Sequence, residues 1–187
     1  MFSEFAEVSS ATWGVIVALL LVGVVVFAVS KDKKRWTARM LANGALCIAL
    51  STVLSFITLY KMPQGGSITL ASMLPMFLFA YAYGVGPGML VGAAYGFVQF
   101  LQGGLYFVHP VELLLDYPLA FAMLGLAGLS NKFSDQWGMI PGIILGTFGR
   151  FVCAFLSGLI FFGMYAPEGQ NVVIYSMVYN GLYLVPE

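Results

Sequence analysis

The sequence predicts an all-α integral membrane protein, and two observations carry this prediction. Of its 187 residues, 60% are hydrophobic and only 9% are charged, whereas a soluble domain typically has about 25% charged residues. Apolar runs of about 20 residues recur along the chain, the length that a helix needs to cross a hydrocarbon core of about 30 Å. The eight basic and eight acidic residues cancel, and no basic surface indicates a nucleic-acid partner.

The first apolar run covers residues 12–30 and is followed by the basic segment 31–35. A cleaved signal peptide carries its positive charge before the apolar stretch. We therefore interpret 12–30 as an uncleaved transmembrane helix whose basic end lies in the cytoplasm. Residues 1–35 are then an N-terminal transmembrane helix with its basic linker, and residues 36–187 form the main membrane domain.

Five further apolar segments predict helices in this domain, and a last one covers 172–187. The five are residues 39–59, 68–83, 89–101, 111–129 and 139–162. Six basic residues of the termini and loops then lie on the cytoplasmic side, and only Lys61 lies outside, as the positive-inside bias requires. This orientation brings the loops at 61–67, 102–110 and 165–171 to the external face of the cell membrane.

The residues that carry catalysis or hold metals are scarce. The single histidine, His109, makes a zinc site improbable, because such a site needs three or four ligands. Cys47 and Cys153 both fall inside apolar runs, where thiols behave as small hydrophobes. No phosphate-binding loop is present. The sequence therefore indicates neither an enzyme nor a metal or other cofactor, and no ATP bound by this chain.

A polar, aromatic stretch at residues 106–118 leads into the segment 111–129 and places Asp116 about six residues inside it. An ionised carboxylate in a membrane is costly, so it is a functional-site hypothesis by default. Pro118 frees a backbone carbonyl and permits a bend, which suits a cavity wall. Asp116 can neutralise a cationic ligand or form an ion pair with Arg150, and the sequence leaves both interpretations open.

Aromatic residues gather at the same face, and two interpretations apply to them as well. They form an interfacial belt or a wall that stacks on a planar ligand; the residues are Tyr106, Phe162, Tyr165, Tyr175, Tyr179 and Tyr183. The amide of Asn180 can read a heterocycle edge or bond another helix. Alanines at 38, 42, 45 and 49 leave one smooth helix face, for packing inside this protein or for docking a partner subunit.

Taken together, five segments resemble the thiamine-specific substrate-binding (S) component of energy-coupling factor (ECF) transporters. Their order and spacing carry the resemblance, which covers residues 39–187; the segments are 62–67, 109–117, 157–163, 165–167 and 175–180. Each segment alone is a weak signal, and the set is specific.

The resemblance implies a six-helix bundle of the bacterial plasma membrane that binds thiamine at its outer side with high affinity and without turnover. It implies ligand contacts from Asp116, Tyr117, Tyr106, Phe162, Tyr175 and Asn180, and a lid loop containing Gln64, Gly65 and Gly66. Docking through Ala45 and Ala49 would join the chain to a shared transmembrane subunit and two ATPase subunits, which use the ATP.

Three departures accompany the resemblance. Ala154 stands where the family carries a ligand-contacting histidine, and Phe162 stands where it can carry tryptophan. The helix at 12–30 is extra to the family pattern, and residues 172–187 span at most about 24 Å as a helix, short of a full crossing. The sequence leaves open whether it is truncated there or whether the N-terminal helix occupies part of that place. The alternatives are therefore an S component for a pyrimidine or thiazole precursor of thiamine, or a structural membrane protein without a ligand.

Overall fold

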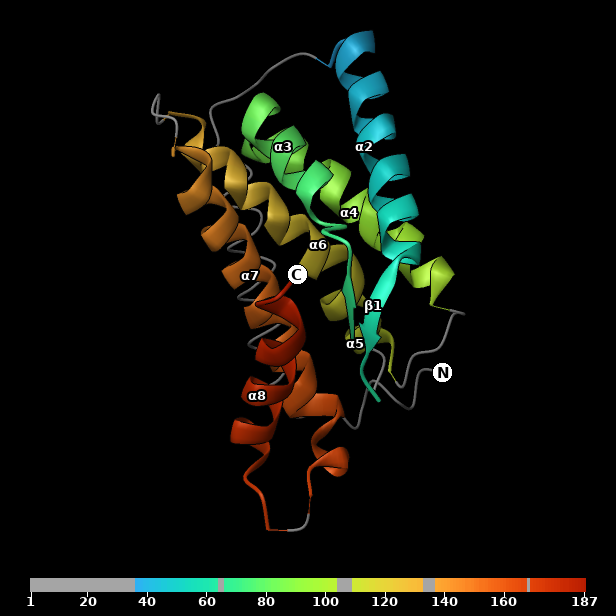
Figure 1. Cartoon of the computed structure of the whole chain (residues 1–187), viewed down its shortest axis with the longest axis vertical. Coiled ribbons are helices and arrows are strands. Elements are labelled where there is room, and N and C mark those ends of the chain that lie inside the picture. Colours follow the sequence, from blue (N-terminus) through green and yellow to red (C-terminus); the bar gives the residue numbers. More distant parts are fainter. Residues whose placement is uncertain (1–35, 64–65, 104–108, 133–136, 168) are drawn as a thin grey trace.

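The computed structural model describes residues 36–63, 66–103, 109–132, 137–167 and 169–187. The predicted N-terminal helix at 12–30, and with it the proposed division at residue 35, lies outside the described residues. Within them the chain is a bundle of helices with one short hairpin (Figure 1). The predicted all-α membrane class is confirmed, and the hairpin is an addition to it.

The first described helix, α2, covers Ala38–Phe56 and begins where Thr37 caps it, with the Thr37 hydroxyl accepting from the Met40 N–H over 3.2 Å. Strands β1 (Thr58–Lys61) and β2 (Ser67–Thr69) follow and pair in an antiparallel hairpin.

The predicted third span, 68–83, is therefore wrong in its first part. Helix α3 covers only Leu74–Tyr83, and residues 67–69 pair with β1 instead. Gly84, at a φ of 96°, ends α3 and starts α4 (Val85–Gln102), so the two helices meet without a loop. The Gly-rich segment that the sequence placed between two spans is thus mostly the first turn of α4.

The segment that carries Asp116 is one long helix that changes its winding. It runs through α5 (Pro110–Leu114), the π-helical turn η2 (Leu115–Leu119), α6 (Ala120–Met123) and the 3₁₀ stretch η3 (Leu124–Lys132). A capping box starts it, because His109 Nδ1 accepts from the Val111 N–H and Glu112 accepts from the His109 N–H, both over 3.1 Å.

Helix α7 (Met139–Phe161), a short 3₁₀ turn η4 (Gly163–Tyr165) and α8 (Val172–Leu184) complete the chain. Stretch η3 packs on α3, α4 and α7. The helix from Pro110 to Lys132, of which η3 is the last part, is therefore the centre of the bundle. The hairpin, the start of α5 and the link between α7 and α8 lie at the same end of the molecule (Figure 1). The predicted convergence of these segments on one face agrees with this arrangement.

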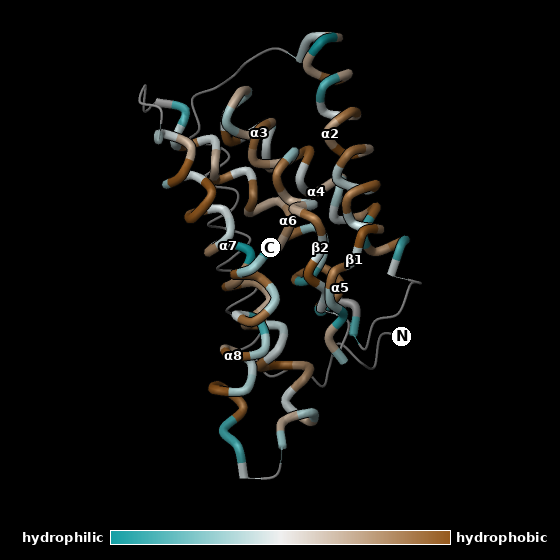
Figure 2. The backbone as a smooth tube through the Cα atoms, in the orientation of Figure 1, coloured by the Kyte–Doolittle hydropathy of each residue, from teal (hydrophilic) through white to brown (hydrophobic). Residues whose placement is uncertain are grey.

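Three helices of the described residues are long and apolar enough to cross a membrane: Ala38–Phe56, Val111–Asn131 and Met139–Phe161. Hydrophobic residues dominate α2 and α7 (Figure 2). Many of these side chains are exposed, among them Phe56, Ile144 and Phe148. An apolar exterior of this kind is suited to lipid and is unusual for a soluble monomer.

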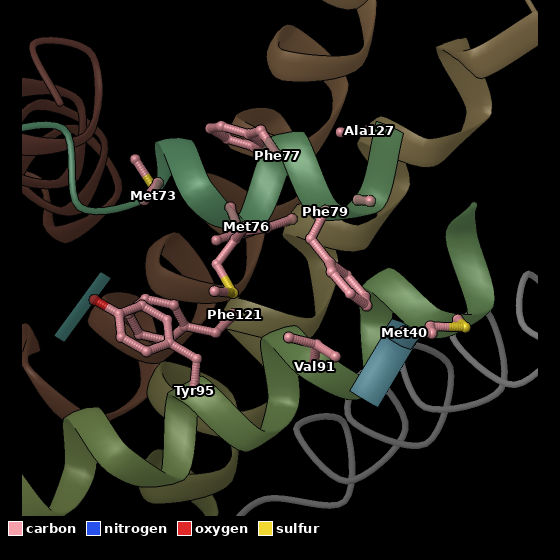
Figure 3. Close-up of a cluster of buried hydrophobic side chains, with 11 residues drawn as sticks. Met40, Met73, Met76, Phe77, Phe79, Val91, Tyr95, Phe121 and Ala127 are labelled. Atoms are coloured by element: carbon pink, nitrogen blue, oxygen red, sulfur yellow. The ribbon is translucent and has the colours of Figure 1, made fainter. Parts of the chain in front are cut away.

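The buried core lies where α3, α4 and the α6–η3 region meet (Figure 3). Tyr95 is fully buried there and packs its ring edge-to-face on Phe121, with ring centroids 5.0 Å apart. The Tyr95 hydroxyl donates to the Ser51 carbonyl over 3.1 Å, and Gln99 donates to the same hydroxyl over 2.6 Å. The first bond ties α4 to α2, and the second holds the side chain of Gln99, which lines the cavity described next.

Candidate binding site

A cavity of about 500 Å³ lies between the hairpin, η2, α7 and α8. This volume is within the range of small-molecule sites. Its charged lining residues are three carboxylates and two cations: Glu112, Asp116, Glu187, Lys61 and Arg150. Acidic side chains thus outnumber basic ones in the lining by one, which favours a cationic or hydrogen-bond-donating ligand.

Asp116 lines this cavity from the π-helical turn η2. Pro118 has no backbone N–H, so the regular helical bond cannot form there, and the chain accommodates this with a wider turn of the kind that recurs at functional sites. One carboxylate oxygen of Asp116 accepts from the Ser157 hydroxyl over 2.7 Å. The bend suggested by Pro118 in the sequence is thus present as η2.

Arg150 does not pair with Asp116, so the ion-pair interpretation is not what the structure shows. The guanidinium of Arg150 lies 4.2 Å from the centre of the Phe121 ring, and one of its nitrogens faces the sulfur of Met73. The Asp116 carboxyl therefore accepts from the Ser157 hydroxyl and lines a cavity in which a cationic or N–H-donating ligand can meet it.

Of the five predicted aromatic residues that the structure describes, four form a cavity wall and Tyr165 does not. Tyr175, Tyr179 and Tyr183 repeat every four residues along one face of α8, with successive ring centroids 6.0 and 5.9 Å apart, and all three line the cavity. Phe162 lines it from the end of α7. Tyr165 is 43% exposed and is not part of the lining, which fits the belt interpretation for that residue.

Asn180 lines the cavity and also bonds neighbouring groups. Its amide nitrogen donates to the Ala154 carbonyl over 3.2 Å and to the Ser176 carbonyl over 2.9 Å. Its amide oxygen accepts from the Tyr183 hydroxyl over 3.1 Å. The structure therefore shows the helix-joining role that the sequence left open, at a residue that also lines the cavity.

The other predicted site residues divide into three groups. Tyr117 and Gly66 line the cavity, and the Tyr117 ring packs edge-to-face on Phe100 at 5.4 Å. Tyr106, Gln64 and Gly65 lie outside the described residues. Ala45 and Ala49 are exposed on α2 and are not part of the cavity lining, as a docking face requires.

Sequence reasoning missed several lining residues. Thr69, Ser72 and Glu187 come together where the hairpin and α3 meet the end of α8, and the Thr69 and Ser72 hydroxyls both donate to the Glu187 carboxylate. The only sequence signal is their polarity within apolar runs. Ala154, noted as a departure from the family pattern, also lines the cavity.

The apolar exterior, the three membrane-length helices and the charged internal cavity define a multi-pass membrane protein with a small-molecule site. Residues 41–187 match the thiamine transporter protein family. The chain belongs to this family, and the resemblance found in its motifs is confirmed at that level.

Three relatives illustrate the similarity. The thiamine transporter ThiT of Bacillus subtilis (strain 168) is 36% identical over an alignment of 155 residues, and the match covers 76% of this chain and 80% of that protein. The thiamine transporter ThiT of Lacticaseibacillus paracasei is 32% identical over an alignment of 123 residues, and the match covers 58% of this chain and 61% of that protein. The structure of ThiT from Listeria monocytogenes matches with a TM-score of 0.68 and 28% identity, over 79% of this chain and 85% of that chain.

Proposed function

We propose that this chain is the high-affinity thiamine-binding S component of an ECF-type importer and captures its ligand at the outer face of the cell membrane. The observation that carries the proposal is the Asp116 carboxylate, bonded to Ser157 and facing a cavity with an aromatic wall. Thiamine combines a planar aminopyrimidine, whose N–H groups can donate to a carboxylate, with a cationic thiazolium ring. Carboxylates and tyrosine faces are the groups that hold such a cation.

Within this proposal, Asp116 accepts from the aminopyrimidine, and Phe162 and Tyr175 stack on the rings. Tyr117 and the amide of Asn180 supply further polar contacts, and Tyr106, Gln64, Gly65 and Gly66 complete the site from the two loops. The chain itself performs no chemistry and needs no metal or cofactor. Energy comes from two partner ATPases through a transmembrane subunit, which docks on the face that contains Ala45 and Ala49.

Titration calorimetry on the purified protein in detergent tests the proposal. We expect nanomolar binding of thiamine, with much weaker binding of its pyrimidine precursor and no binding of riboflavin. Tighter binding of the pyrimidine precursor would assign the chain to that ligand instead. No heat from any of the three compounds at high-micromolar concentration would contradict a ligand-binding role. Calorimetry is preferable to tryptophan quenching, because Trp36 and Trp137 do not line the cavity.

Ala154 gives a second test of the site. Its methyl group lines the cavity, one turn of α7 from Gly158, at the position where the family resemblance implies a histidine that contacts the ligand. We expect Ala154→His to tighten thiamine binding by about 2- to 10-fold, the effect of one added hydrogen bond. The matched control Ala154→Phe adds similar bulk without the hydrogen bond and is expected to weaken binding. Equal losses in both variants would show that this wall has no room for a side chain and that no contact is restored.

A further inference from the structure

The hairpin and α8 form two walls of the cavity. Residues of both elements line it: Thr58, Lys61, Gly66, Ser67 and Thr69 from the hairpin, and Tyr175, Ser176, Tyr179, Asn180 and Tyr183 from α8. Among the described residues, the backbone-to-backbone hydrogen bonds of the hairpin stay within it and its own flanks. The bonds that join the hairpin to α8 and to the residues after it therefore each involve a side chain.

Glu187, three residues after the end of α8, makes the main connection. Its carboxylate accepts from the Thr69 N–H over 3.2 Å, from the Thr69 hydroxyl over 2.5 Å and from the Ser72 hydroxyl over 2.6 Å. Hydrogen bonds to an ionised acceptor are shorter and stronger than neutral ones. Thr69 and Ser72 are 6% and 4% exposed, so water cannot easily replace the carboxylate.

A second connection lies nearer the tip of the hairpin. The Gly66 N–H donates to the Tyr179 hydroxyl oxygen over 3.2 Å. A Cβ atom at Gly66 would lie 2.9 Å from a ring carbon of Tyr183 and 3.1 Å from the Tyr179 hydroxyl oxygen, so the glycine backbone lies directly against both rings. The hairpin is thus held to α8 at both ends of β2.

We propose that Glu187 is a positioning residue for ligand binding. It holds the hairpin against α8 through Thr69 and Ser72, and the strength of this joint sets the rate at which a bound molecule leaves the cavity. The inference rests on the proposed function, since thiamine is the ligand that reports the rate. Its physical basis is that the two walls can separate only when the bonds to Glu187 break.

Glu187 also lines the cavity, so a direct contact with a cationic ligand is the competing explanation. A substitution at Ser72 distinguishes the two explanations. Ser72→Ala removes one bond to Glu187 but leaves the carboxylate and its charge in place. If Glu187 acts on the hairpin, Ser72→Ala reproduces part of the effect of Glu187→Gln, and the double variant adds little. Ser72 also lines the cavity, so if both residues instead contact the ligand directly, their effects are independent and the double variant shows the product of the two.

The experiment measures association and dissociation of thiamine by stopped flow on the wild type, Glu187→Gln, Ser72→Ala and the double variant. We expect Glu187→Gln to raise the dissociation rate about 10- to 100-fold and Ser72→Ala about 3- to 10-fold, with association rates within about 3-fold. The control is Ser130→Ala, whose hydroxyl donates to the Ala127 carbonyl away from the cavity. Its rates are expected to match the wild type.

Hydrogen exchange of the ligand-free protein tests the joint without any ligand. The amides of residues 66–70 are expected to exchange faster in Glu187→Gln, and those of α7 to remain unchanged. Unchanged exchange and unchanged dissociation would each overturn the inference. If Glu187→Gln does not fold, the dissociation rate and the hydrogen exchange of Ser72→Ala test the inference instead. Faster exchange in a protein whose wild type binds no thiamine would reject the proposed function and leave the joint established.

Discussion

Asp116→Asn is expected to weaken thiamine binding about 10- to 100-fold relative to the wild type. A hydrogen bond to a charged group contributes about 1.5–3 kcal/mol, and each 1.4 kcal/mol is tenfold in affinity. Asparagine keeps an oxygen that accepts from Ser157, so the wall keeps its shape while the charge is lost. The lining then loses one of its three carboxyl groups, and its preference for a cationic ligand falls.

Calorimetric affinities of three proteins isolate the role of this charge: the wild type, Asp116→Asn and Ser157→Ala. Ser157→Ala removes the hydroxyl that donates to Asp116 but keeps the carboxylate. We expect it to weaken binding by less than about 10-fold, the effect of losing one neutral hydrogen bond. Unchanged affinity in Asp116→Asn would show that another group, with Glu112 the nearest acid in sequence, meets the cation.

The helices were predictable where an apolar run coincides with one helix. The predicted spans 39–59 and 139–162 agree with α2 and α7 to within three residues, because each crosses the bundle as a regular helix. The prediction of a helix at 68–83 was wrong at 68–73. The segment 68–73 continues the apolar run of α3, but the backbone of Ile68 and Thr69 pairs with β1. Apolarity alone does not distinguish a strand from a helix when the pairing partner lies outside the window.

The candidate site shows the same limit. Asp116 and Pro118 were identifiable, because a carboxylate and a proline in an apolar segment have few structural explanations. The site roles of Asp116 and the other predicted contacts stay predictions until binding is measured. The joint at Glu187 could not be predicted, because its partners Thr69 and Ser72 are more than 110 residues away and meet it only in the folded chain.

The second large effect is expected for Gly96→Ala, because Gly96 packs against the π-helical turn η2 that carries Asp116. Helix α4 approaches the central helix through Gly88, Gly92 and Gly96, one glycine on each turn. A Cβ atom at Gly96 would lie 2.8 Å from the carbonyl carbon of Tyr117 and 3.0 Å from the Cα of Pro118. Backbone atoms cannot rotate away as a side chain can, so η2 would have to shift as a unit.

We expect Gly96→Ala to lower the free energy of unfolding by about 1–3 kcal/mol, the usual cost of overpacking. Thiamine affinity should fall with it, because the displaced turn carries Asp116 and Tyr117. The matched control is Gly181→Ala in α8, where an added Cβ meets nothing within 4 Å. The free energy of unfolding of that variant should rise by up to about 1 kcal/mol from helix propensity.

Thermal unfolding in detergent, with and without thiamine, distinguishes the two variants. The melting temperature should fall in Gly96→Ala and rise or stay unchanged in Gly181→Ala. A Gly96→Ala protein with wild-type melting and affinity would show that η2 tolerates displacement, and that the close approach of α4 does not position the carboxylate.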